Sequence, residues 1–155
     1  MADLNLDIIG AWGRTRDFQI TGWGESDLDA LLTAVGAAQG KRIIADQSPE
    51  LGIYYRQDAF EFARAGVPSV HLRRGLDYID KPASYGKEVS GAYTANDYHQ
   101  VTDIVRPDFD FSGGAELAEF AFAVGYRLAQ DGRFPRWLPG TEFKAKRDAM
   151  MNAKP

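Results

Sequence analysis

The sequence predicts an α/β fold, in which helices cover both faces of a mostly parallel sheet. Two observations lead to this prediction. Short apolar runs of strand length alternate with longer segments in which apolar residues recur at helical spacing. Their order along the chain, with strands and helices alternating, is typical of α/β domains. The 155 residues are enough for one domain that buries about 70% of its unfolded surface.

Four segments have the composition of strands. The first is an apolar run around a central carboxylate, Asp7, and Pro68 stands near the start of the last, where its missing N–H is tolerated. The predicted strands are residues 4–9, 18–21, 42–45 and 67–72. A charge in the middle of a buried strand is costly unless it is paired. A metal ion is the usual partner of such a charge in a hydrolase core.

Two helices are predicted between these strands. Ser26 is placed to cap the first helix, and Gly40 is placed to end it. Asp58 and Glu61 have the spacing of a capping box at the start of a shorter second helix. We expect this second helix to bury Phe62, with Phe60 as a second candidate for burial, and to end at Gly66.

The last predicted helix is the longest. It begins at Ser112, which can cap it, and runs to about Gln130, with Gly132 as its exit. Apolar residues at helical spacing predict its buried stripe. These residues are Leu117, Phe120, Ala121, Val124 and Leu128.

Two further segments are predicted to be irregular. Residues 73–102 are rich in Gly, Tyr and Asp, and loops of such length are usually functional or disordered. Beyond a domain of residues 1–132, prolines break the chain, and we expect residues 133–155 to form a solvated tail. The basic residues of this tail are Lys144, Lys146, Arg147 and Lys154.

Composition limits the classes of function. The net charge of −4 gives no electrostatic reason to bind nucleic acid or an anionic membrane surface. The absence of cysteine excludes disulfides and thiolate metal sites. No run of residues approaches the length of a membrane span, and the N-terminus does not have the pattern of a signal peptide.

Four residues are candidates for chemistry. Asp7 can be a strand-end carboxylate bonded to a neighbouring loop, or an oxygen ligand at the carboxyl end of a strand, where α/β sheets bind ligands. His71 is expected simply to end a strand. His99 can be a surface residue, but Tyr98 precedes it, and a tyrosine can donate to an oxyanion while a histidine holds a metal.

Five segments in one order resemble the aminopeptidase Y-type family of co-catalytic zinc exopeptidases, which share the glutamate carboxypeptidase and transferrin receptor-like fold. The first, Asn-Leu-Asp-Ile-Ile-Gly, is similar to the Asn-Leu-Asp-Met-Ile-Gly strand of that family. The five segments are residues 5–10, 24–29, 55–60, 65–68 and 98–99. The resemblance implies the C-terminal part of a zinc-exopeptidase, phosphorylase/hydrolase-like fold.

The resemblance also implies roles for individual residues. Asp7 would be a ligand of one zinc ion and His99 a ligand of the other, while the Tyr98 hydroxyl would stabilise the tetrahedral oxyanion. Asp58 falls in a segment near the site and could contact the ligands from a second layer. Its neighbours Gln57 and Ala59 stand where the family has Ser and His, so any contact made by that His is missing.

The rest of the family's site has no counterpart in this sequence. The family uses a further His, a metal-bridging Asp, a Glu ligand and a general-base Glu, all of which precede the Asn-Leu-Asp strand. We therefore expect a C-terminal fragment of a metal-dependent aminopeptidase, with weak or no zinc binding and no activity alone. The alternatives are a non-enzymatic interaction module of the same fold, and a site completed by a partner chain. An uncovered sheet edge further predicts self-association as a homodimer.

Overall fold

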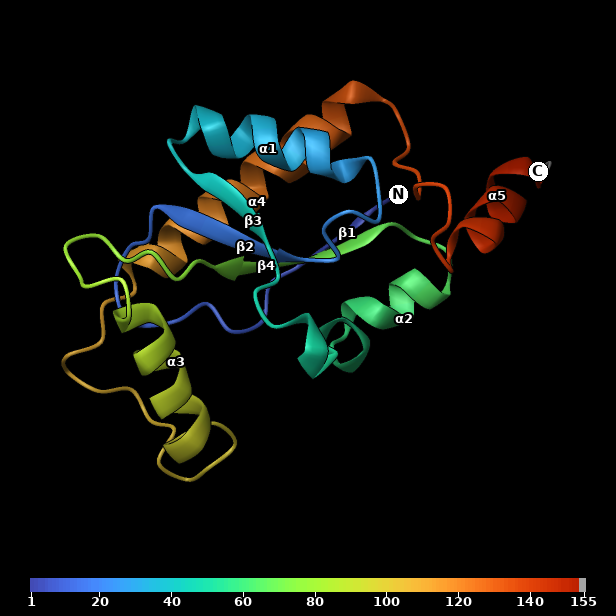
Figure 1. The fold of residues 1–155 in the computed structure, drawn as a ribbon. Helices are drawn as coiled ribbons and strands as arrows, with labels where there is room; N and C mark the ends of the chain where they lie inside the picture. The colour runs from blue at the N-terminus through green and yellow to red at the C-terminus, as the bar shows by residue number, and fades with distance from the viewer. Residues whose placement is uncertain (154–155) are drawn as a thin grey trace.

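The computed structural model of this chain describes residues 1–153 and contains a four-stranded sheet of order β1-β4-β2-β3 (Figure 1). The strands are β1 (Asp3–Asn5), β2 (Asp17–Thr21), β3 (Arg42–Ala45) and β4 (Ser69–Arg74). β1 pairs with β4 and β2 with β3 in parallel, whereas β2 and β4 are antiparallel. The predicted α/β fold with a mostly parallel sheet is confirmed.

The described part of the chain contains five α-helices. They are α1 (Leu28–Ala38), α2 (Ala59–Arg64), α3 (Tyr85–Asn96), α4 (Ser112–Asp131) and α5 (Lys144–Asn152). α1 and α4 pack side by side over one face, whereas α2 lies on the other side, against β4 and β1 (Figure 1). α3 extends away from the sheet (Figure 1). No helix within residues 1–153 is long and apolar enough to cross a membrane.

The main core lies between the sheet and the pair α1 and α4. Alternate strand residues point to this face, because successive side chains of a strand point to opposite sides. They meet the predicted stripe of α4, in which Leu117, Phe120 and Val124 are fully buried. The strand residues of this core are Phe18, Ile20, Val70 and Leu72.

The first strand is shorter than predicted, and this changes the environment of Asp7. β1 pairs with β4 only from Asp3 to Asn5, and the chain turns at Gly10, where φ is 76°. Asp7 therefore follows the strand and is exposed. The expectation that its charge is buried in mid-strand was wrong, because the apolar residues 8 and 9 do not continue the strand.

None of the three side chains that were predicted to cap a helix does so. Asp58 has helical φ and ψ angles instead of the extended backbone of a capping residue, and Glu61 is paired with Arg64 at 2.8 Å. The hydroxyls of Ser26 and Ser112 are buried and have no hydrogen-bond partner among residues 1–153. The predicted exits are correct, since Gly40 and Gly132 follow α1 and α4 with left-handed φ angles.

Two predictions on intermediate segments were also wrong. The segment 73–102, expected to be irregular, contains α3. Gly86 is the only buried residue of this helix, so its sequence has no apolar stripe from which a helix could be predicted. Phe62 of α2 is 52% exposed, whereas Phe60 packs with Trp137 and Phe143 in a second small core.

Residues 133–153 do not form the expected solvated tail. Trp137 is buried and donates from Nε1 to the carbonyl oxygen of Gly66 at 3.1 Å. In α5 the guanidinium of Arg147 is buried and donates to the carbonyl oxygens of Met1 and Pro135. Aromatic residues and hydrogen bonds thus hold this segment against the rest of the chain. Lys154 lies outside the described residues.

Candidate functional site

The face of the sheet opposite the main core is polar. Asn5, His71 and Thr21 are paired neighbours on β1, β4 and β2, so their side chains share this face. Gln19 and Arg73 form the next row. Because Gln19, Thr21 and His71 are all buried, this face is a covered polar layer and not solvent-facing surface.

His71 is the most unusual member of this layer. Its side chain is 4% exposed, and neither Nδ1 nor Nε2 has a hydrogen-bond partner within the described chain. Burial and the neighbouring Arg73 lower the pKa of His71 to about 4, although Asp7 and Asp46 act in the opposite direction. His71 is therefore a neutral imidazole at pH 7, with one free donor and one free acceptor.

Arg73 supplies the positive charge of the layer. Its guanidinium lies 3.6 Å from a carboxylate oxygen of Asp46, which also accepts a hydrogen bond from Thr21 Oγ1 at 3.5 Å. Burial lowers the pKa of Arg73, while Asp46 and Asp7 raise it. Asp7 thus lies within the electrostatic reach of Arg73 and His71, where the C-terminal ends of the parallel strands β1 and β4 meet.

Within residues 1–153, several other polar atoms of β1 and of the segment before α2 are buried without a hydrogen-bond partner. They are Asp3 Oδ2, Asn5 Nδ2 and both amide atoms of Gln57. Buried polar groups in folded proteins are nearly always hydrogen-bonded, so unpaired ones call for a specific explanation. A polar ligand or a further polypeptide segment on this face would satisfy them.

Tyr98 and His99 lie apart from this layer. They follow the C-terminal end of α3, which is directed away from the sheet (Figure 1). Both side chains are exposed, and their rings are stacked with centroids 3.8 Å apart. His99 has a left-handed backbone, with φ of 60°. Asp58, at the start of α2, is also exposed.

The described residues do not fit a zinc site. Within residues 1–153 no group of three or more His, Cys, Asp or Glu side chains is placed to hold a metal ion. Asp7 acts electrostatically on Arg73, which is a cation and therefore not a metal ligand. His99 follows the end of α3, which extends away from the sheet (Figure 1). A structural or catalytic zinc ion needs at least three protein ligands.

The family of the chain follows from the sequence comparisons. The sequence model of peptidase family M28 matches residues 1–113, from β1 to the first turn of α4. The chain belongs to peptidase family M28. The resemblance to zinc exopeptidases is thereby confirmed at the level of the family, and with it a metallopeptidase-type, hydrolytic function. Members of family M28 are typically zinc-dependent. Searches of curated proteins and of solved structures found no match.

The polar layer was missed in the sequence, although a signal for it exists. Along β4, the polar residues Ser69, His71 and Arg73 alternate with the apolar residues Val70 and Leu72. Alternation of this kind is typical of a strand with two different faces. We treated this strand as uniformly buried, and so did not expect polar side chains beneath the sheet.

Proposed function

We propose that this M28 chain carries part of the active site of an aminopeptidase Y-type zinc exopeptidase, which hydrolyses N-terminal peptide bonds. The observation that supports this most is the position of Asp7. It leaves the sheet at the carboxyl ends of β1 and β4, beside the buried polar layer, and ligands of α/β proteins bind at such ends. In this proposal Asp7 and His99 are zinc ligands, and Tyr98 donates to the oxyanion.

The remaining metal ligands and the general-base Glu would come from outside the described residues. Asp7 and His99 alone cannot hold two zinc ions, so we infer that residues 1–153 hydrolyse no peptide by themselves and bind zinc weakly or not at all. Asp58 would not bind zinc itself and would contact the zinc ligands from a second layer of residues.

The experiment compares this chain with the longer protein encoded by an extended reading frame, or with this chain plus a polypeptide that supplies the missing ligands. Zinc content and hydrolysis of leucine 4-nitroanilide are measured for each. We expect both only in the completed protein, and we expect Asp7→Ala and His99→Ala to abolish hydrolysis there. Asp108→Ala, which changes another exposed carboxylate, is the matched control. Full activity of either site variant would refute these assignments.

A non-enzymatic interaction module is the second candidate function. The replacement of the family's Ser and His by Gln57 and Ala59 favours it, because the amide of Gln57 is buried without a partner and can bond to a docked polypeptide. A completed protein that binds no zinc and hydrolyses no peptide would support this candidate against the first.

We also propose that the chain self-associates as a homodimer through β1. Asp3 donates its N–H to Pro68, so the N–H and C=O of Leu4 face the other, unpaired edge of the sheet. A groove beside this edge is lined by apolar residues, among them Leu128 and Phe134. Sedimentation analysis should show a dimer for the wild type and for Leu4→Ala, but a monomer for Leu4→Pro, which lacks the outward N–H. A monomeric wild type would refute the proposal.

A further inference from the structure

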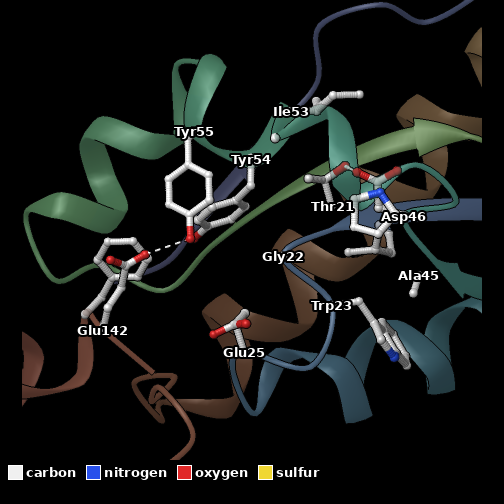
Figure 2. Close-up of a pocket in the computed structure, with 14 residues that line it drawn as sticks. Thr21, Gly22, Trp23, Glu25, Ala45, Asp46, Ile53, Tyr54, Tyr55 and Glu142 are labelled. Carbon is white, nitrogen blue, oxygen red and sulfur yellow. Dashed lines mark hydrogen bonds between the residues drawn. The ribbon is translucent and has the colours of Figure 1, made fainter. Parts of the chain in front are cut away.

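A cavity of about 330 Å³ opens beyond the C-terminal ends of β2 and β3 (Figure 2). Its walls come from the ends of these strands, from the segment 49–55, and from residues 142–143 ahead of α5. The cavity therefore combines segments from both ends of the chain. Its volume is at the lower end of the range for small-molecule sites, and suits a single side chain or a small organic group.

Aromatic side chains form much of the wall. Tyr54 and Tyr55 pack edge to face with ring centroids 5.6 Å apart, and Phe143 lies 6.1 Å from Tyr54. Trp23 lies at the opposite side of the cavity (Figure 2). Aromatic rings attract cations to their faces, and Trp does so best.

Every charged side chain that lines the cavity is acidic. These residues are Glu25, Asp46 and Glu142 (Figure 2). Asp46 is paired with Arg73, but within residues 1–153 neither glutamate forms an ion pair with a Lys or Arg. Glu142 accepts a hydrogen bond from the Tyr55 hydroxyl at 3.0 Å. The cavity thus holds more negative charge than its own residues compensate.

The hydroxyl of Tyr54 adds an unpaired polar atom to this cavity. It is buried and has no hydrogen-bond partner in the described chain. Burial raises the pKa of Tyr54, and the charges of Glu25 and Glu142 raise it further. The hydroxyl therefore stays protonated and can donate a hydrogen bond to a group that enters the cavity.

We propose that this cavity, the acidic aromatic pocket, binds the cationic side chain of a basic residue in a peptide. An ammonium or guanidinium group on an aliphatic stem would place its charge near Glu25 and Glu142 and its stem against the aromatic rings. A bare metal ion would leave those rings unused. The proposal does not depend on the proposed peptidase function, since Asp7, Tyr98 and His99 do not line the pocket.

The test is a nuclear magnetic resonance titration of the chain with N-acetyl-arginine amide. The indole N–H signal of Trp23, assigned by its loss in Trp23→Phe, reports on the pocket. We expect a saturable shift of this signal. N-acetyl-citrulline amide has nearly the same shape without the charge, and should bind at least about tenfold more weakly, a difference of about 1.4 kcal/mol. Equal binding of both compounds, or no shift with either, would overturn the proposal.

Variants separate the pocket from general surface charge. Glu25→Gln combined with Glu142→Gln should weaken binding of the arginine derivative at least tenfold. Glu119→Gln, on the exposed side of α4, removes a carboxylate elsewhere and should leave binding unchanged. An equal loss of binding in the double variant and in Glu119→Gln would refute the acidic aromatic pocket as the binding site. The comparison of arginine with citrulline needs no variant, so it decides the question even if the double variant does not fold.

Discussion

The ring of Phe120 on α4 packs against the ring of Phe18 on β2, with centroids 5.0 Å apart and planes inclined at 39°. Both side chains are at most 1% exposed, so this contact joins the helix layer to the sheet at the centre of the core. Phe120→Ala removes the ring and leaves a cavity that neighbouring side chains cannot fill. We expect it to lower the free energy of unfolding by about 3 to 5 kcal/mol, measured by urea denaturation.

Phe122→Ala is the matched control on the same helix. Its ring is 73% exposed, so its removal should change the free energy of unfolding by less than about 1 kcal/mol. Similar losses for Phe120→Ala and Phe122→Ala would show that α4 packs with a different face toward the sheet.

The stability of the chain should depend on pH through His71. The folded pKa of this residue is about 4, below the unfolded value of about 6.5, so the unfolded state binds more protons between these values. The free energy of unfolding should therefore fall as the pH falls from 6.5 toward 4. The expected contribution is about 2 kcal/mol between pH 7.5 and 4.5. Urea denaturation at these two pH values measures it.

His71→Leu should remove this contribution. Since neither imidazole nitrogen has a partner, the loss of the ring leaves no new unpaired group on another residue. We expect the variant to be at least as stable as the wild type at pH 4.5. The charges of Asp7, Asp46 and Arg73 also act on His71, so the difference between variant and wild type is the quantity to compare. If the stability difference between His71→Leu and the wild type is the same at pH 7.5 and at pH 4.5, His71 is not the source of the pH dependence.

The parts of the fold that pack against the main core were predictable from the sequence. The stripe of α4 is as predicted, because burial of one face imposes a period that the sequence records. The strand 42–45 also has the predicted bounds, and its Ile43 packs against this core. α3 escaped prediction for the opposite reason, since it extends from the domain and buries only Gly86. Capping was overestimated, because spacing alone does not fix the backbone angles of residues such as Asp58.

The candidate site was predictable only in part. Motif residues such as Asp7 and His99 could be named from a family resemblance. The buried layer around His71 and Arg73 depends on the antiparallel pairing of β2 with β4, which places their polar sides together. The acidic aromatic pocket depends on the return of residues 142–143 to the end of the sheet. The alternation along β4 records that this strand has a polar face, but no local pattern records which strand or segment lies beside it.

Arg147 should be a determinant of stability despite its distance from the main core. Its buried guanidinium donates to the carbonyl oxygens of Pro135 at 3.0 Å and of Met1 at 3.1 Å. Arg147→Ala removes these charged donors and leaves both carbonyls without them, so we expect a loss of about 2 to 4 kcal/mol. The exposed neighbour Lys146, changed to Ala, should cost less than about 0.5 kcal/mol in the same thermal or urea denaturation. Equal effects would mean that α5 does not dock through Arg147.

His99 should carry a backbone cost that only glycine relieves. Its φ of 60° lies in the left-handed region, which costs a non-glycine residue about 1 kcal/mol or more. We expect His99→Gly to be as stable as the wild type or more stable, and His99→Val to be less stable by at least about 1 kcal/mol. Equal stability of both variants would show that this backbone conformation is not maintained in solution. Strained backbone angles cluster at functional sites, in line with the proposal that His99 is a zinc ligand in the completed enzyme.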